Sequence, residues 1–414
     1  MKKISLEEII RAIAIALDLA EIGSVENTKI IEDITNIDYS QHTFMHHSKR
    51  TTYIGLEIAK QLNLNNNSIK QLYVSSLLHD IGAIDSLKRS HNSSYIKQHC
   101  LIGSSIVEAF PKLNNISNII LYHHENYDGS GPMELKNSSI PIESQIIRIS
   151  DLIEVLYDEN YSSYVQKQSI INWIKSKANV IFSEEIINAF LEICSKDIFW
   201  FNIENVSYID FILDDTSPNL QIYLNLDEFE NIAYIFSKVI DNKSKFTAKH
   251  SKEISHLAYK VSKYLGYSEE KCMEMKIAGL LHDIGKLAIP SDILDKNGAL
   301  TNEEFAIIKS HSYYTNIILG RIKNIDNIKK WASNHHEKLN GKGYPRGLTN
   351  EDLCEESKIL AVCDIYQALT EDRPYRKGLD NKKAFDIIEN MVMEGEISGM
   401  AVNSLKNTLK MGNL

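Results

Sequence analysis

The sequence contains few cysteines and prolines, and it lacks any long uninterrupted hydrophobic run. Its five cysteines form no Cys-x-x-Cys pair, a pattern that indicates reduced thiols rather than a disulfide framework. The apolar stretch from Ile9 to Leu19 is interrupted by charged residues and is too short to cross a membrane. No signal-peptide cleavage pattern accompanies it. We therefore expect a soluble cytoplasmic protein that has no membrane partner.

An excess of positive charge is also absent. The net charge is −10, which argues against a nucleic-acid binder that relies on a basic surface, so no DNA partner is expected. If the ligand is an anion, its counter-charges must be concentrated in the binding site. Seven prolines and long amphipathic segments favour helices, and 414 residues are enough for two domains, each with its own core.

The strongest pattern is a His-Asp dipeptide that occurs twice in the same framework. His79 follows His47 by 32 residues, and His282 follows His250 by 32 residues. Further histidines, an acidic residue and a Gly-rich loop follow each dipeptide in the same order. Two copies of one all-helical module are the natural interpretation. We place the first domain at 1–215, a linker at 216–227 around an Asp-Asp-Thr-Ser-Pro-Asn turn, and the second domain at 228–414.

The repeated residues are of the types that bind metal ions. The candidate ligands of the second copy are His250, His282, Asp283, His311, His335, His336 and Asp364. Those of the first copy are His47 (or His46), His79, Asp80, His99, His123, His124 and Asp151.

Five histidines and two aspartates exceed what one ion needs, so each set suits two divalent ions that share a carboxylate. Asp283 is the candidate for the shared ligand in the second copy. Mixed imidazole and carboxylate ligation favours iron or manganese over magnesium. Two metals ~3.5–4 Å apart activate water and stabilise phosphoryl displacement. The expected reaction is hydrolysis of a phosphate ester, with Asp283 as a catalytic residue.

The second copy also offers groups that suit an anionic substrate. Lys286 lies one helical turn from the His-Asp pair, where it can contact a phosphate oxygen and act as a second catalytic residue. Arg373 and Arg376 are candidates for a phosphate or guanine clamp. Tyr344, in a Gly-rich loop, offers a ring for stacking. In the first copy Ala83 stands in the place of Lys286, and the tyrosine and arginines have no counterparts. We interpret that copy as capable of binding metal but non-catalytic.

The second copy resembles the HD-GYP family of bacterial cyclic-dinucleotide phosphodiesterases over roughly residues 228–400. The motifs that carry the resemblance are His250, His282 to Lys286, His311, His335 to Glu337, Gly341 to Pro345, and Asp364 to Arg376. The first copy looks like a plain HD domain of the same superfamily. The resemblance implies an all-α fold of two tandem HD-superfamily domains, a di-metal centre, and hydrolysis of cyclic di-GMP to linear pGpG or GMP.

The resemblance leaves the base specificity open, because some tandem members prefer 3′,3′-cGAMP. Some members also have a glutamate that supports a third metal, and Phe246 occupies that position here, so two metals are favoured. Asn340, Ser312 and Gln367 replace commoner residues at positions that are not proposed ligands.

Two other functions stay open. One is a weakly active or inactive scaffold that contacts signalling proteins through its first domain. The other is hydrolysis of a different phosphate, such as a nucleotide monophosphate or triphosphate. The sequence indicates no oligomeric state.

Overall fold

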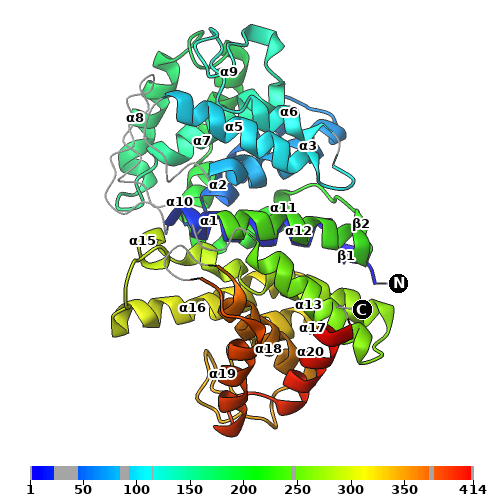
Figure 1. The fold of residues 1–414 in the computed structure, drawn as a ribbon. Coiled ribbons are helices and arrows are strands. Elements are labelled where there is room, and N and C mark those ends of the chain that lie inside the picture. The colour runs from blue at the N-terminus through cyan, green and yellow to red at the C-terminus, as the bar shows by residue number, and fades with distance from the viewer. Residues whose placement is uncertain are drawn as a thin grey trace. The chain divides into compact units, whose positions relative to one another are not determined.

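The structure, a computed structural model, describes residues 2–22, 45–83, 93–113, 115–243, 249–372 and 377–411. Helices form almost all of its regular structure, and a two-stranded pairing is the one sheet among the described residues (Figure 1). The predicted all-α fold class is confirmed. No helix in the described part of the chain is both long and apolar enough to cross a membrane.

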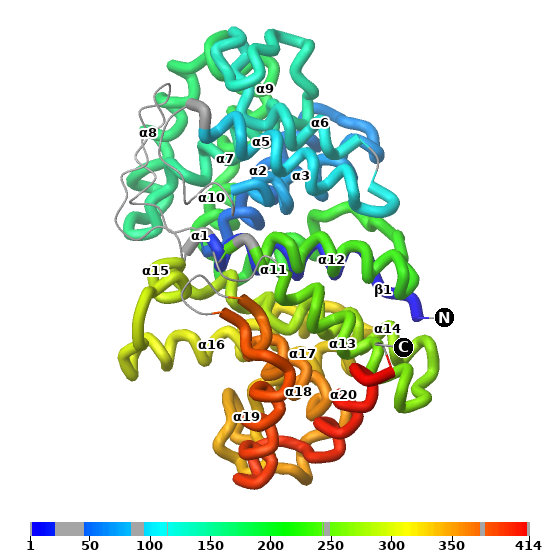
Figure 2. Tube along the Cα trace, in the orientation of Figure 1, coloured from blue at the N-terminus to red at the C-terminus, as the bar shows by residue number. Residues whose placement is uncertain are grey.

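The chain forms two compact units that do not coincide with its two halves. The N-terminal unit is Ile13–Ile222, and the C-terminal unit combines Tyr223–Leu414 with Met1–Ala12. Strand β1 (Ile4–Ser5) pairs antiparallel with β2 (Tyr223–Leu224), which explains why the first residues belong to the C-terminal unit (Figure 2). The expected domains of 1–215 and 228–414 stay a prediction, while the compact units divide the chain after Ile222 and include the first twelve residues in the C-terminal unit. The expected linker of 216–227 contains β2 and the start of the next helix.

The N-terminal unit is built from short helices around α2, which packs against α3 and α7. Helix α1 begins at Leu6, before this unit, and ends within it at Ile22. The remaining elements are α2 (His47–Gln61), α3 (Asn66–Leu78), η2 (His79–Gly82), α5 (Ser93–Glu108), α6 (Ile116–Leu121), η3 (Asn137–Ser139), α7 (Ile142–Leu156), α8 (Ser163–Ser176), α9 (Glu184–Cys194), α10 (Asp197–Glu204), η4 (Val206–Tyr208) and α11 (Ile209–Thr216).

The C-terminal unit repeats the arrangement, with α13 packed against α14 and α18. Its helices are α12 (Leu226–Lys243), α13 (His250–Tyr264), α14 (Glu269–Leu281), η5 (Ile284–Ala288), α15 (Ser291–Leu294), α16 (Asn302–Leu319), α17 (Asp326–Ser333), α18 (Glu355–Thr370), α19 (Asn381–Met393) and α20 (Gly399–Met411).

In both units a buried aspartate from the preceding helix caps the helix that begins with the first histidine of the motif. Asp18 of α1 accepts hydrogen bonds from the hydroxyl and the main-chain N–H of Ser48, at 2.7 and 3.2 Å. Asp241 of α12 accepts the same two bonds from Ser251, at 2.7 and 3.3 Å. Free N–H groups in a first helical turn need such acceptors. The repeat therefore extends to the helix before each motif.

The glycine after each His-Asp-Ile allows two helices to approach closely. A Cβ on Gly285 would lie 1.9 Å from the main-chain oxygen of His311, and one on Gly82 would lie 2.1 Å from that of His99. Only a residue without a side chain fits at these distances. The short helices η5 and η2 can therefore pack directly against α16 and α5, which carry the next histidines of the two motifs.

Candidate metal centres

In the C-terminal unit, the start of one helix and the end of the next bring the first candidate ligands together. His250 is the first residue of α13, and His282 and Asp283 follow the end of α14. Nitrogen and carboxylate oxygen atoms of these three residues lie within 4.8 Å of one another. Asp364 of α18 completes the group, since its Oδ1 lies 3.2 Å from His250 Nε2.

A second cluster lies on the other side of the Asp283 carboxylate. It contains His311 of α16 and the pair His335 and His336, which follows α17. Asp283 Oδ2 lies 3.0 Å from His282 Nε2, whereas Oδ1 lies 3.5 Å from His311 Nε2. Each carboxylate oxygen thus faces a different cluster. A bridging ligand requires this arrangement, and all seven candidate ligands of the second copy lie together.

Hydrogen bonds to the main chain set the proton positions on three of these imidazoles. The Nδ1 atoms of His282, His311 and His335 lie 2.8, 2.7 and 2.6 Å from the carbonyl oxygen three residues earlier. A carbonyl only accepts, so each Nδ1 carries the proton and each Nε2 keeps its lone pair for a metal. Asp283 Oδ1 is buried and has no hydrogen-bond partner among the described residues. This donor set fits a pair of divalent ions.

The electrostatic surroundings keep most of the donors in the form that binds metal. Burial lowers the pKa of His311 to about 3, and burial and His336 hold the pKa of His335 well below its usual range. Burial alone would raise the pKa of the Asp283 carboxyl, but His282 and Lys286 outweigh it and hold that pKa well below its ordinary value. The imidazoles of His311 and His335 are therefore neutral, and the Asp283 carboxylate is ionised, near neutral pH.

His250 is the exception among the ligands. Burial lowers the pKa of His250, but hydrogen bonds to Asp364 and Glu371 outweigh burial and raise it to about 9. Its Nδ1 lies 3.1 Å from Glu371 Oε2, at the end of α18. In the N-terminal unit His47 Nδ1 lies 2.5 Å from Glu154 Oε2. Sequence analysis missed both glutamates; the available signal was an acidic residue within two helical turns after the last aspartate of each motif.

Lys286 lies in η5 and pairs with the bridging carboxylate itself. Its Nζ is 2.6 Å from Asp283 Oδ2, and the Lys286 side chain is 22% exposed. Burial lowers the pKa of the Lys286 ammonium, but the Asp283 carboxylate outweighs burial and raises it. The lysine is therefore a charged group at the rim of the centre, within reach of an oxygen atom of a bound anion.

The Tyr344 ring lies over the second cluster. Its centroid is 4.8 Å from that of His336 and 6.3 Å from that of His311. The close approach requires Gly343, because a Cβ there would lie 2.3 Å from the main-chain N of Lys338. The two other predicted substrate-binding residues, Arg373 and Arg376, lie outside the described residues.

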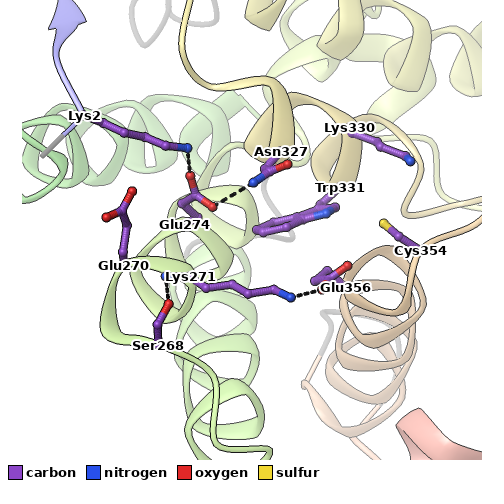
Figure 3. A pocket seen from close by; sticks show the side chains of 10 residues that line it. All are labelled: Lys2, Ser268, Glu270, Lys271, Glu274, Asn327, Lys330, Trp331, Cys354 and Glu356. Atoms are coloured by element: carbon purple, nitrogen blue, oxygen red, sulfur yellow. Dashed lines mark hydrogen bonds and ion pairs between the residues drawn. The ribbon is translucent and has the colours of Figure 1, made fainter.

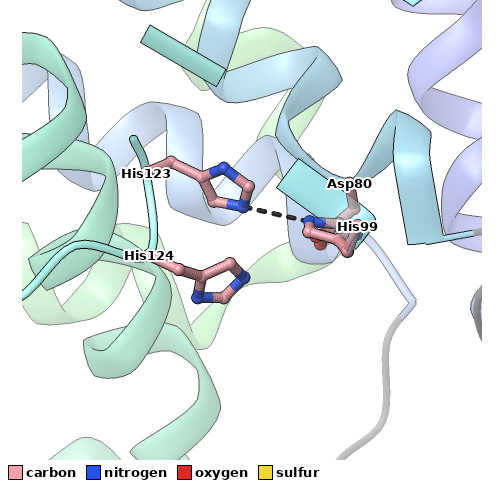
Figure 4. Close-up of side chains that lie close together, drawn as sticks. All are labelled: Asp80, His99, His123 and His124. Carbon is pink, nitrogen blue, oxygen red and sulfur yellow. Dashed lines mark hydrogen bonds and ion pairs between the residues drawn. The ribbon is translucent and has the colours of Figure 1, made fainter. Parts of the chain in front are cut away.

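The N-terminal unit also brings its seven candidate ligands together. Asp80 Oδ2 lies 3.0 Å from His79 Nε2 and 3.3 Å from His47 Nε2, whereas Asp80 Oδ1 lies 3.2 Å from His99 Nε2. Asp151 Oδ1 is 3.5 Å from His47 Nε2. His47, rather than its neighbour, is thus the histidine that faces the group. The remaining pair, His123 and His124, groups with His99 and Asp80 (Figure 4).

The N-terminal unit differs from the C-terminal one in its cations. Ala83 stands in the place of Lys286, and no lysine among the described residues pairs with Asp80. Comparing the two sequence copies did not reveal Arg148 of α7. This residue is 1% exposed and places its Nη1 3.1 Å from His124 Nδ1. Ala361 stands at the equivalent position of the C-terminal unit, three residues before the last aspartate of the motif.

A polar pocket of about 420 Å³ in the C-terminal unit lies apart from the candidate ligands, none of which lines it. Two ion pairs cross its lining: Lys2 pairs with Glu274, and Lys271 pairs with Glu356 (Figure 3). Asn327 donates a further hydrogen bond to Glu274 at 3.1 Å. Because no candidate ligand lines this pocket, it is not the candidate active site.

Known proteins resemble both units. A family model described as an HD domain matches residues 30–171 and 234–397, which together exceed half of the chain. The 3′3′-cGAMP-specific phosphodiesterase 1 of Vibrio cholerae is 29% identical over 370 residues, covering 85% of this chain and 84% of the relative. Cyclic di-GMP phosphodiesterase PA4108 of Pseudomonas aeruginosa is 36% identical over 140 residues, or 34% of each chain. The crystal structure of V-cGAP3, a cyclic GMP-AMP specific phosphodiesterase of V. cholerae, shares the fold, with a TM-score of 0.69 and 22% identity over 99% of this chain and 98% of that chain.

Proposed function

Because the chain belongs to the HD domain family, we propose that this phosphodiesterase hydrolyses a cyclic dinucleotide at the metal centre of its C-terminal unit. The observation that carries the proposal is the Asp283 carboxylate, which turns one oxygen toward each of two histidine clusters. Two bound ions would supply Lewis acidity and a water of lowered pKa. Imidazole and carboxylate donors favour iron or manganese in this role.

The chain's own residues hold and orient the substrate. The seven candidate ligands would hold the ions and so set where the scissile phosphate binds. Lys286 compensates negative charge that develops on a phosphate oxygen, a contribution that is strongest where solvent is excluded. Tyr344 presents a ring face at the edge of the second cluster, where a base can stack. Arg373 and Arg376 remain proposed phosphate or guanine contacts on the basis of the sequence alone.

We take 3′,3′-cGAMP as the first substrate to test and cyclic di-GMP as the second. The cGAMP-specific relative resembles this chain over 85% of its length, which includes both units. The cyclic di-GMP phosphodiesterase of P. aeruginosa resembles only 34% of it. The N-terminal unit is proposed to be non-catalytic, since Ala83 leaves its Asp80 without the lysine that Asp283 has.

The test is an assay of both cyclic dinucleotides side by side on the full chain loaded with iron or manganese. Chromatography should show a linear dinucleotide, and Asp283→Ala should abolish its formation. His250→Ala should do the same, whereas His256→Ala, an exposed histidine on the same helix, should retain full activity. Full activity of Asp283→Ala would reject the mechanism. A wild-type protein that retains no metal and hydrolyses neither substrate would favour the scaffold function.

A further inference from the structure

The N-terminal unit contains a buried cation that competes with a metal ion for one of its histidines. Arg148 Nη1 lies 3.1 Å from His124 Nδ1, and Arg148 Nη2 donates to Asn126 Oδ1 at 3.4 Å. An arginine side chain has only donors and keeps its charge at any pH at which proteins fold. In this contact His124 must therefore accept, so the lone pair of Nδ1 is engaged.

The contact leaves His124 without a nitrogen for a metal. A neutral imidazole whose Nδ1 accepts a hydrogen bond carries its proton on Nε2. Ligation through Nε2 would require Nδ1 to become the donor, and two donors would then face each other. Ligation through Nδ1 would require the guanidinium to leave. Either way the metal and Arg148 exclude one another at His124.

The two clusters of this unit are affected differently. His124 belongs to the cluster that also contains Asp80, His99 and His123 (Figure 4). That cluster loses one donor and gains a fixed positive charge beside it, and both changes disfavour a divalent cation.

The other cluster, which consists of His47, His79 and Asp151, has no such conflict. Nδ1 of His47 is bound by Glu154, and Nδ1 of His79 lies 2.8 Å from the main-chain oxygen of Ser76. The Nε2 atoms of His47 and His79 lie 3.3 and 3.0 Å from Asp80 Oδ2, and neither contacts a guanidinium in the described part of the chain.

The C-terminal unit provides the internal comparison. Ala361 stands three residues before Asp364, as Arg148 stands three residues before Asp151. His336, the counterpart of His124, has its Nδ1 3.8 Å from an oxygen of Asp364 instead of against a guanidinium. The second cluster of that unit therefore keeps all of its donors.

We propose that Arg148 takes the place of a second metal ion in the N-terminal unit, which binds a single divalent ion through His47, His79, Asp80 and Asp151. The unit then has a metal but lacks the paired ions that phosphodiester hydrolysis uses. The proposal concerns metal binding alone and does not depend on the substrate of the C-terminal unit.

The experiment uses the full chain with Asp283→Ala, which disrupts the C-terminal centre, and Mn²⁺ as the probe. After loading and gel filtration, elemental analysis should find about one more ion per chain when Arg148→Met is added. Methionine is unbranched and of similar length, so it fills the space without the charge. A further His99→Ala change should remove the extra ion. His124→Ala, which leaves Arg148 in place, should not create one.

Electron paramagnetic resonance of the Mn²⁺-loaded Asp283→Ala chain is a second measurement, made first with Arg148 unchanged and then with Arg148→Met. The proposal expects the spectrum of isolated ions, and addition of Arg148→Met should produce the exchange-coupled spectrum of a pair. A coupled pair in the presence of Arg148 would overturn the proposal. So would an unchanged metal content in an Arg148→Met chain whose circular dichroism and melting are those of a folded protein.

Discussion

Replacing Glu371 with alanine should weaken metal binding in the C-terminal unit while leaving the unit folded. Glu371 holds Nδ1 of His250 at 3.1 Å, and its side chain is 15% exposed against 4% for His250. Water can therefore replace the carboxylate, and the loss to folding stability should be small. The loss to the metal site is larger, because carboxylates that orient a ligating histidine typically contribute about 10–100-fold in metal affinity or activity. This factor corresponds to about 1.4–2.7 kcal/mol.

The pKa of His250 determines where this effect is visible. In the metal-free protein the pKa of His250 is raised to about 9, so a metal must displace a proton at lower pH. Metal affinity of the wild type should rise about tenfold per pH unit below that value and level off above it. Without Glu371 the imidazole loses its proton at lower pH. Near neutral pH the variant therefore loses less metal affinity to proton competition than the wild type does, which offsets part of the affinity lost with Glu371. The full difference in metal affinity between wild type and variant appears above about pH 9.

A second substitution provides the rescue. Gln367 follows Asp364 by three residues, as Glu154 follows Asp151, and Glu154 binds the equivalent histidine. Adding Gln367→Glu to the Glu371→Ala variant should therefore restore metal affinity.

The assay is competitive titration of Mn²⁺ with a chelator of known affinity between about pH 6 and pH 10, together with thermal melting. Replacement of the exposed Glu351 by alanine is the control for the loss of one surface carboxylate. A folded Glu371→Ala variant with wild-type affinity across the whole range would refute the reasoning, as would failure of Gln367→Glu to restore binding.

Three further predictions concern packing, pH and substrate. Gly285→Ala should destabilise the C-terminal unit by about 1–3 kcal/mol in urea unfolding, because the new methyl group meets the main-chain oxygen of His311; Gly55→Ala, whose Cβ would find ordinary contact distances, should change stability little. Burial raises the pKa of Asp241 to about 6, above its unfolded value of 3.8, so its contribution to stability is present at low pH and is lost as the pH rises through about 6. The stability of Asp241→Asn relative to the wild type, measured by thermal melting, should therefore increase by about 1–3 kcal/mol from pH 4 to pH 7. An equal stability difference at the two pH values would contradict this. Tyr344→Ala should raise KM about tenfold or more with a smaller change in kcat, whereas Tyr344→Phe, which keeps the ring, should keep the wild-type KM. An equal rise in KM in the two variants would exclude stacking.

The ligands could be predicted from the sequence because local structure fixes most of their geometry. His282 and Asp283 are adjacent at the end of an apolar helix, and the same framework occurs twice with equal spacing. The repeat predicted the all-α fold class, and the resemblance of its motifs to a known family predicted the HD superfamily. Both are confirmed, by the helices and by the two segments that the family model matches. The ligand roles themselves and the assigned domain limits remain predictions, to be tested by the variants described above.

Other features could not be predicted because they depend on packing between distant segments. Glu371 reaches His250 across 121 residues of sequence, and it lies four residues later than the equivalent glutamate of the other unit would suggest. Arg148 was missed because its contact with His124 depends on how α7 packs. The positions that correspond to Lys286, Arg373 and Arg376 hold no cationic residue in the first copy, and Arg148 lies at none of them. The contribution of the first twelve residues to the C-terminal unit was equally hidden, since two short strands carry no periodic signal.

The pairing of β1 with β2 has a consequence for how the protein is synthesised and dissected. The ribosome produces Ile4 more than two hundred residues before Leu224, its partner, so the C-terminal unit cannot form its strand pair until the intervening residues have been synthesised. A truncation that begins at Tyr223 would present an unpaired strand and the apolar surface that Ile4 otherwise covers, which favours aggregation. An isolated C-terminal unit would therefore have to include the first twelve residues, either fused to it or joined by circular permutation.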